Sequence, residues 1–178
     1  MQFASPDALE RARRVKLMIF DVDGVLTDGK LWYGPAGEEI KAFHSFDGLG
    51  LKMLAKSGVG LALLSGRSSP AVAARATELG IEHVLQGIEH KRESHEGLLK
   101  RLGIGREASG YMGDDLVDLP VLLRCGFGCT TPDAPEEVRK RVHYVAASHA
   151  GAGAAREVCE YIMRAQGTLE AALEEYLK

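Results

Sequence analysis

The chain has 178 residues, 46% of them hydrophobic, and this size and composition predict one domain over residues 1–178 with a single sizeable core. Its 22 basic residues and 25 acidic residues give a formal charge of −3 and form no long basic block, which argues against a nucleic-acid partner. No apolar segment is long enough to span a bilayer, which argues against a membrane protein.

Short apolar runs alternate with longer helix-like segments along the chain. The apolar runs predict strands at residues 15–20, 59–64, 83–85, 109–112, 126–129 and 143–145. The intervening patterns predict helices near residues 48–57, 69–79, 91–102, 115–124, 134–141, 153–165 and 168–177. Because parallel strands need crossover connections, this order predicts an α/β fold: a Rossmann-like, doubly wound parallel sheet with helices on both faces.

Two segments depart from this alternation. Between "KLWYG" and "EEIKAF" the turn signal "PAG" predicts a protruding β-hairpin, which spans about residues 27–43. At the other end, residues 153–178 are expected to form a C-terminal helical tail.

Cysteine and histidine usage gives no sign of a zinc site. The three cysteines are odd in number and form no CxxC motif, and His90 and His95 are five positions apart, which predicts a solvated helix surface. The N-terminal segment has no secretory signal pattern. We therefore expect a soluble, unprocessed protein in a reduced, cytoplasmic setting.

Polar side chains follow four of the predicted strands. Ligands of such sheets bind beyond the carboxyl ends of the strands, near the point where the strand order reverses. Each residue alone also has a structural explanation as a turn, a cap or a solvated charge. Together the residues at these strand ends supply the carboxylates, hydroxyl and ammonium group that phosphoryl transfer requires. The residues are Asp21, Asp23, Ser65, Gly66, Arg67, Lys91, Asp114 and Asp115.

These residues also carry a family resemblance. "DVDGVLT" (21–27), "LLSGR" (63–67), Lys91 and "GDDLVD" (113–118) resemble the four ordered motifs of haloacid dehalogenase superfamily phosphatases. The segments "DGKLWYGPAGEEIKAFHSFDGLGLKML" and "AGAGAAREVCEYIMRAQG" are similar to the 3-deoxy-D-manno-octulosonate 8-phosphate (Kdo 8-phosphate) phosphatase family. The resemblance implies hydrolysis of Kdo 8-phosphate to Kdo and phosphate, for lipopolysaccharide precursor synthesis.

The resemblance implies a role for each motif residue. Asp21 would attack phosphorus to form an aspartyl phosphate, while Asp23 would protonate the departing sugar oxygen and later activate water. Ser65 and Lys91 would hold the phosphoryl oxygens. The implied Mg²⁺ ligands are Asp21, the backbone carbonyl of Asp23, and Asp114. Asp115 and Asp118 would orient them, unless Asp118 is simply a helix residue.

The residues between the motifs leave no room for a cap domain, so we expect a neighbouring subunit to cover the site. Members of the resembled family are tetramers, and the resemblance implies a homotetramer here. The implied sugar-acid contacts are Asp23, His44, Ser45, Phe46, Asp47, Gly48, Lys52, Gly66, Arg67, Arg75 and Lys91.

The exact activity remains open between three alternatives. Phe46 and Ala152 stand where the family usually carries basic residues. A phosphatase for a nine-carbon, sialic-acid-type 9-phosphate is therefore the nearest alternative substrate assignment. An alternative of another class is a catalytically silent tetrameric binding subunit, although such a subunit has no chemical reason to keep both Asp21 and Asp23.

Overall fold

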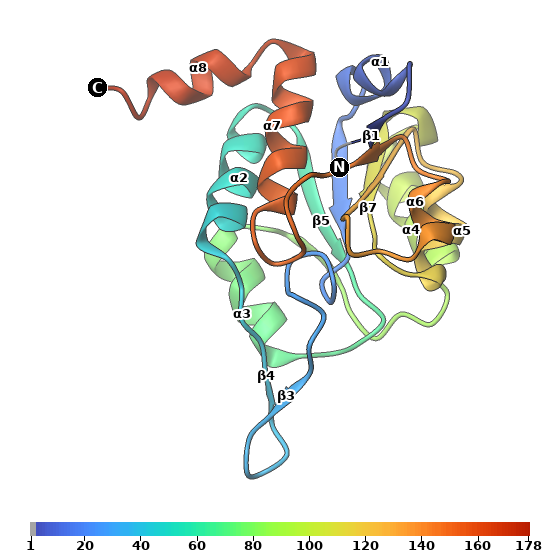
Figure 1. The fold of residues 1–178 in the computed structure, drawn as a ribbon, viewed down its shortest axis with the longest axis vertical. Coiled ribbons are helices and arrows are strands. Elements are labelled where there is room, and N and C mark those ends of the chain that lie inside the picture. Colours follow the sequence, from blue (N-terminus) through green and yellow to red (C-terminus); the bar gives the residue numbers. More distant parts are fainter. Residues whose placement is uncertain (1–2) are drawn as a thin grey trace.

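The computed structural model describes residues 3–178 (Figure 1). It contains a seven-stranded sheet in the order β1-β9-β8-β7-β2-β5-β6. Neighbouring strands are parallel, except that β1 runs antiparallel to β9. The strands are β1 (Phe3–Ala4), β2 (Leu17–Phe20), β5 (Gly60–Leu64), β6 (His83–Leu85), β7 (Ser109–Met112), β8 (Phe127–Thr130) and β9 (Tyr144–Val145).

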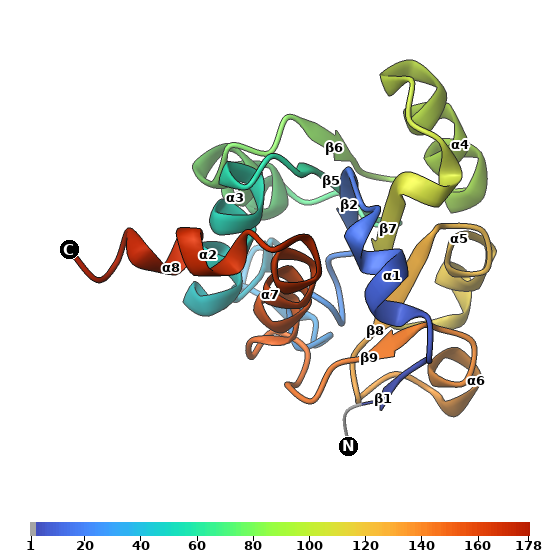
Figure 2. The ribbon, with the colours of Figure 1, turned by 90° about the horizontal axis from the view of Figure 1, so that it is seen from above.

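Helices cover both faces of this sheet, which confirms the predicted doubly wound α/β fold (Figure 2). One face carries α1 (Ala8–Arg13), α2 (Ser45–Lys56), α3 (Pro70–Leu79) and α7 (Ala154–Gln166). The other carries α4 (Lys91–Leu102), α5 (Leu119–Leu122) and α6 (Glu136–Arg139), with the 3-10 helices η1 (Arg106–Ala108) and η2 (Leu116–Asp118) nearby in sequence.

The central strand β2 joins the two layers of the core. Because successive side chains of a strand point to opposite faces, Met18 and Phe20 pack under α2 and α7, while Leu17 and Ile19 pack under α4 and α5. All four side chains are buried. The apolar run before Asp21 therefore forms a strand that is covered on both faces, as expected for a parallel sheet.

Helix α2 begins at Ser45, three residues before the predicted start. Its N-terminus is capped by His44, whose Nδ1 accepts a hydrogen bond from the backbone N–H of Phe46 at 3.2 Å. The glycines Gly48 and Gly50 weaken the helical pattern in the sequence. Packing accounts for Gly50, because a Cβ there would lie 2.8 Å from the Cα of Arg156 on α7.

The hairpin consists of β3 (Trp32–Tyr33) and β4 (Glu39–Ile40) and extends away from the sheet (Figure 1). Its paired strands are much shorter than the predicted hairpin segment at residues 27–43. The interval between β2 and β5 holds this hairpin and α2, and the interval from Lys91 to Met112 holds α4, η1 and β7.

Several predicted elements differ in the structure. The helix predicted at 115–124 is η2 followed by the short α5, and the helix predicted at 168–177 is α8 (Leu169–Glu174). Strand β1 and helix α1 were not predicted, because two-residue and six-residue elements carry no clear periodicity. The predicted solvated surface at His95 is wrong, since this side chain is buried beneath α4.

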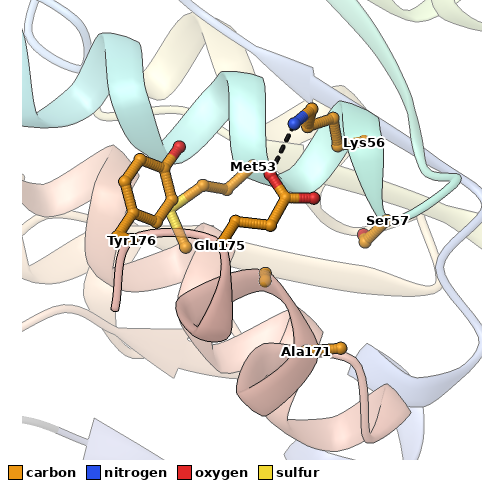
Figure 3. Close-up of a pocket in the computed structure, with 7 residues that line it drawn as sticks. Met53, Lys56, Ser57, Ala171, Glu175 and Tyr176 are labelled. Carbon is orange, nitrogen blue, oxygen red and sulfur yellow. Dashed lines mark hydrogen bonds and ion pairs between the residues drawn. The ribbon is translucent and has the colours of Figure 1, made fainter. Parts of the chain in front are cut away.

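The C-terminal tail extends α7 through Gly167 into α8, which lies beside α2 (Figure 3). A cavity of about 130 Å³ lies between the two helices, lined by residues such as Met53, Ala171 and Tyr176. Glu175 at its edge pairs with Lys56 of α2 at 2.5 Å. None of the described helices combines the length and apolar character needed to cross a membrane.

Candidate active site

The order of the strands reverses at β2, which is flanked by β5 and β7. Phe20, the last residue of β2, pairs with Leu63 of β5 and with Met112 of β7. The residues that follow these strands therefore meet at one edge of the sheet, where doubly wound folds bind ligands.

A cavity of about 310 Å³ opens at this edge. It brings together the seven polar residues and Gly66 that were predicted at the strand ends. Its lining residues are Asp21, Asp23, Gly29, Leu31, Ser65, Gly66, Arg67, Lys91, Asp114, Asp115 and Val117.

Lys91 links the carboxylates at the floor of the cavity. Its buried Nζ donates hydrogen bonds to Asp21 Oδ2 and to Asp118 Oδ1, both at 2.7 Å. Burial opposes the positive charge, but the carboxylates of Asp118 and Asp21 outweigh it and raise the pKa of Lys91. Lys91 is therefore a charged residue of the site and not a solvated helix position.

Asp118 accepts hydrogen bonds from four groups around the cavity and is not an ordinary helix residue. Its side chain is fully buried, and its Oδ1 also accepts a hydrogen bond from the hydroxyl of Tyr111 at 2.6 Å. Its Oδ2 accepts the backbone N–H groups of Asp114 and Asp115 at 3.0 and 3.1 Å. Asp118 thus fixes the loop that carries the two preceding aspartates.

The carboxylates are crowded in a way that favours a cation. Oxygen atoms of Asp21, Asp114 and Asp118 all lie within 4.8 Å of one another. Burial, followed by the charge of Asp118, raises the pKa of Asp21 to about 7, although Lys91 opposes this shift. Burial and the charges of Asp118 and Asp21 likewise raise the pKa of Asp114 to about 7. Clustered carboxylate oxygens are donors that fit Mg²⁺.

The turn after the two first aspartates requires glycine. Gly24 has φ +82°, and a Cβ at this position would lie 2.0 Å from Asp114 Oδ2. The hydroxyl oxygen of Thr27 accepts the backbone N–H groups of Gly24 and Gly29 at 3.4 and 3.3 Å. The motif from Asp21 to Thr27 therefore forms a tight loop against Asp114.

The hairpin adds two charged residues that the sequence analysis did not identify. Lys41 binds Asp23 directly, and Glu39 pairs with both Lys41 and Arg67. Their charge and their place beside a predicted turn were the only signals in the sequence. How the base of the hairpin packs against the strand ends is a tertiary property that local patterns do not contain.

A second group of predicted contact residues lies outside this cavity, on α2, α3 and the segment before α2. The Asp47 carboxylate accepts the backbone N–H groups of Gly153 and Arg156, at 3.3 and 2.8 Å, and so caps α7. Arg75 Nη2 donates to the carbonyl oxygen of His44 at 3.5 Å. The residues of this group are His44, Ser45, Phe46, Asp47, Gly48, Lys52 and Arg75, and their contact with substrate stays a prediction.

Fold and site together define a hydrolase of the haloacid dehalogenase-like class, and residues 84–158 match the family model described as haloacid dehalogenase-like hydrolase. The 3-deoxy-D-manno-octulosonate 8-phosphate phosphatase of Haemophilus influenzae is 44% identical over 158 residues, which are 89% of this chain and 88% of the relative. The chain belongs to the 3-deoxy-D-manno-octulosonate 8-phosphate phosphatase family, which confirms the resemblance seen in the sequence.

Two further relatives agree with this assignment. The enzyme of the same name from Escherichia coli K12 is 40% identical over 168 residues, 94% of this chain and 89% of the relative. The crystal structure of the phosphatase of that name from Moraxella catarrhalis, in complex with magnesium, phosphate and KDO, superimposes with a TM-score of 0.94. That chain is 43% identical, and the match covers 96% of this chain and 98% of the other.

Proposed function

We propose that this protein is a Mg²⁺-dependent phosphatase that hydrolyses Kdo 8-phosphate to Kdo and phosphate, a step of lipopolysaccharide precursor synthesis. The observation that carries the proposal is the position of Asp21, whose buried carboxylate lies at the end of β2 beside Lys91 and Asp114. The ligands in the Moraxella catarrhalis structure support the same substrate class and metal.

Asp21 is the nucleophile of the proposed reaction. Its Oδ1 accepts the backbone N–H of Val22 and its Oδ2 accepts Lys91 Nζ, each at 2.7 Å, so the carboxylate is oriented before substrate binds. Attack on phosphorus forms an aspartyl phosphate and breaks the bond to the sugar oxygen. Water then hydrolyses this acyl phosphate.

The metal site of the proposal consists of Asp21, the backbone carbonyl of Asp23, and Asp114. Bound there, Mg²⁺ supplies the positive charge that screens the repulsion between the Asp21 carboxylate and the anionic ester. Asp118 and Asp115 support this set, since the carboxylate of Asp118 holds the backbone of Asp114 and Asp115 in place.

Other residues of the cavity handle the proton and the phosphoryl oxygens. Asp23 donates a proton to the departing sugar oxygen and later takes one from the attacking water. Ser65, Gly66 and Lys91 line the same cavity and hold the transferring phosphoryl group. The Lys91 ammonium then offsets the negative charge that develops during transfer.

The substrate contacts divide between this cavity and a neighbouring subunit. Arg67 lines the cavity with 43% of its side chain exposed, and its planar guanidinium suits a sugar carboxylate. Of the predicted contact residues outside the cavity, His44, Ser45, Phe46, Lys52 and Arg75 are assigned to the subunit interface near a second site. Asp47 and Gly48 are buried in this chain and would support that surface from behind.

We propose a homotetramer as the assembly that brings these residues to a site. The hairpin supports it, because Leu31, Trp32, Tyr33 and Ile40 are each between 45 and 60% exposed. Light scattering of the purified protein is expected to give four times the mass of one chain, and Trp32→Arg is expected to lower that mass. A fully active monomer would contradict this assembly.

The proposed location is the cytoplasm. Cys125, Cys129 and Cys159 are buried free thiols, which suits a reducing compartment. The proposed partners are the small-molecule sugar phosphate and further copies of this chain, with neither nucleic acid nor a membrane as a partner.

Phosphate release from a pair of acidic sugar phosphates tests the proposed function. With Mg²⁺, Kdo 8-phosphate is expected to have a higher kcat/KM than a sialic-acid-type 9-phosphate, and Asp21→Asn is expected to be inactive on both. Preference for the nine-carbon substrate would reassign the substrate and keep the chemistry. Inactivity of the wild type on both, and on aryl phosphates, would favour a silent binding subunit.

A further inference from the structure

A series of ion pairs connects Asp23 with charged residues at the base of the hairpin. The ammonium of Lys41 binds Asp23 Oδ1 and lies 2.7 Å from Glu39 Oε1, and its side chain is only 2% exposed. Glu39, 12% exposed, also forms an ion pair with Arg67, whose Nε donates to Glu39 Oε2 at 3.1 Å. Asp23, Lys41, Glu39 and Arg67 therefore form one connected group at the cavity.

The two carboxylate oxygens of Asp23 have different surroundings. Oδ1 is held by Lys41, whereas Oδ2 is buried and has no hydrogen-bond partner among the described residues. Arg67 Nε lies 4.0 Å from Oδ2, too far for a hydrogen bond. A buried carboxylate oxygen without a hydrogen-bond partner costs folding free energy, so its presence in the cavity indicates a functional role.

The ion pairs within this group of four residues favour the charged form of each partner. The Lys41 ammonium forms ion pairs with the carboxylates of both Asp23 and Glu39, so its nearly buried positive charge lies between two negative charges. Hydrogen bonds from Lys41 and Arg67 lower the pKa of Glu39. Lys41 is thus held as an ammonium ion, and Glu39 as the carboxylate that orients it.

We propose that Lys41, oriented by Glu39, is a positioning residue that fixes the Asp23 side chain with Oδ1 occupied and Oδ2 free to carry the transferred proton. This inference rests on the proposed role of Asp23 as the general acid. During transfer to Asp21, the Oδ2–H bond breaks and the proton moves to the sugar oxygen. That oxygen keeps the electron pair of the breaking P–O bond, and Asp23 is left as a carboxylate beside the Lys41 ammonium.

A purely structural role of Lys41 makes a different prediction. If the ion pairs only tie the hairpin to the sheet, their loss harms every substrate to the same degree. If Lys41 acts through Asp23, its loss harms only substrates whose leaving oxygen needs a proton. Comparison of a sugar phosphate with 2,4-dinitrophenyl phosphate, whose leaving group departs as a stable anion, separates the two roles.

The experiment measures kcat/KM, which covers the steps up to transfer of the phosphoryl group to Asp21. Lys41→Met is expected to lower kcat/KM for Kdo 8-phosphate by about 10- to 100-fold and that for the dinitrophenyl ester by less than about threefold. Glu39→Gln, which keeps the side-chain volume, is expected to show the same selectivity with a smaller loss. Lys30→Met is the matched control, because Lys30 lies on the same segment, is 69% exposed and pairs with Asp28.

A double-variant cycle with Asp23→Asn completes the test. Lys41→Met is expected to add little to the loss caused by Asp23→Asn on Kdo 8-phosphate, since one residue acts through the other. Equal losses on both substrates, or losses that add in the double variant, would overturn the inference. If Asp23→Asn itself shows no preference between the two leaving groups, the proposed role of Asp23 fails instead.

Discussion

Removal of the Asp21 charge is expected to stabilise the protein in the absence of metal. In the folded chain, burial and the charge of Asp118 raise the pKa of Asp21 from 3.8 to about 7. Because the folded pKa lies above the unfolded one, ionisation of Asp21 costs folding free energy as the pH rises from about 4 through about 7. Asp21→Asn removes this cost while keeping the size of the side chain.

The size of the effect follows from the pKa difference. The full cost above pH 7 is on the order of 4 kcal/mol, and lost hydrogen bonds reduce the net gain to about 2 to 4 kcal/mol. For a chain of this length, that gain raises Tm by roughly 5 to 15 °C at pH 8. At pH 4 the two proteins are expected to differ little, since Asp21 is then protonated in the folded state.

Thermal unfolding of both proteins in a metal chelator and in excess Mg²⁺ measures this effect. The wild type is expected to gain stability with Mg²⁺, whereas Asp21→Asn, which lacks a metal ligand, gains much less. The reasoning is refuted if Asp21→Asn is no more stable than the wild type at pH 8 without metal. An equal Mg²⁺ response in both proteins would refute the assignment of Asp21 as a ligand.

Three further substitutions probe the same account. Gly24→Ala is expected to displace the Asp114 carboxylate and so weaken Mg²⁺ binding. The Mg²⁺ concentration that gives half-maximal activity should rise at least about tenfold. Tyr111→Phe removes a 2.6 Å hydrogen bond to Asp118 and is expected to cost about 1 to 2 kcal/mol in urea unfolding, with reduced kcat. Burial lowers the pKa of His95 to about 4, so its contribution to stability is lost as the pH falls from about 6.5 to about 4; His95→Leu is expected to remove about 2 to 3 kcal/mol of this pH dependence.

Each of these expectations has a contrary result. Unchanged Mg²⁺ dependence in Gly24→Ala would show that the turn tolerates a methyl group beside Asp114. Wild-type stability in Tyr111→Phe would show that Asp118 does not need the hydroxyl. For His95→Leu, urea midpoints that fall with acid as steeply as those of the wild type would assign the acid sensitivity to other groups.

The main strands and the cavity were predictable because they depend on local patterns. The buried run before Asp21 has the composition of a central parallel strand, and the aspartates, Ser65 and Arg67 follow such strands within three residues. Lys91 stands apart, six residues beyond the end of β6 at the start of α4. Once these strands form one parallel sheet, their carboxyl ends meet at one edge. Asp21, Ser65 and Asp114 therefore come together without any further information.

The contacts that depend on tertiary packing could not be predicted. The buried position of Lys41 follows from how the base of the hairpin packs against Asp23, and the isolated sequence of the hairpin indicates only a turn. His95 occupies a helix whose polar composition suggested solvent, yet its side chain packs near Ser109 Oγ, at 3.4 Å from Nε2. In both cases burial is decided by elements distant in the sequence.

The central claim is that Asp21 captures the phosphoryl group covalently. Asp23→Asn should slow hydrolysis of that intermediate, so a reaction of this variant with Mg²⁺ and 2,4-dinitrophenyl phosphate can be stopped with acid while the intermediate has accumulated. Mass spectrometry of the digested protein is predicted to find one phosphoryl group on Asp21, and none after the same treatment of a variant that also carries Asp21→Asn. A phosphoryl group on another residue, or phosphate release by the Asp21→Asn variant at the wild-type rate, would contradict the claim.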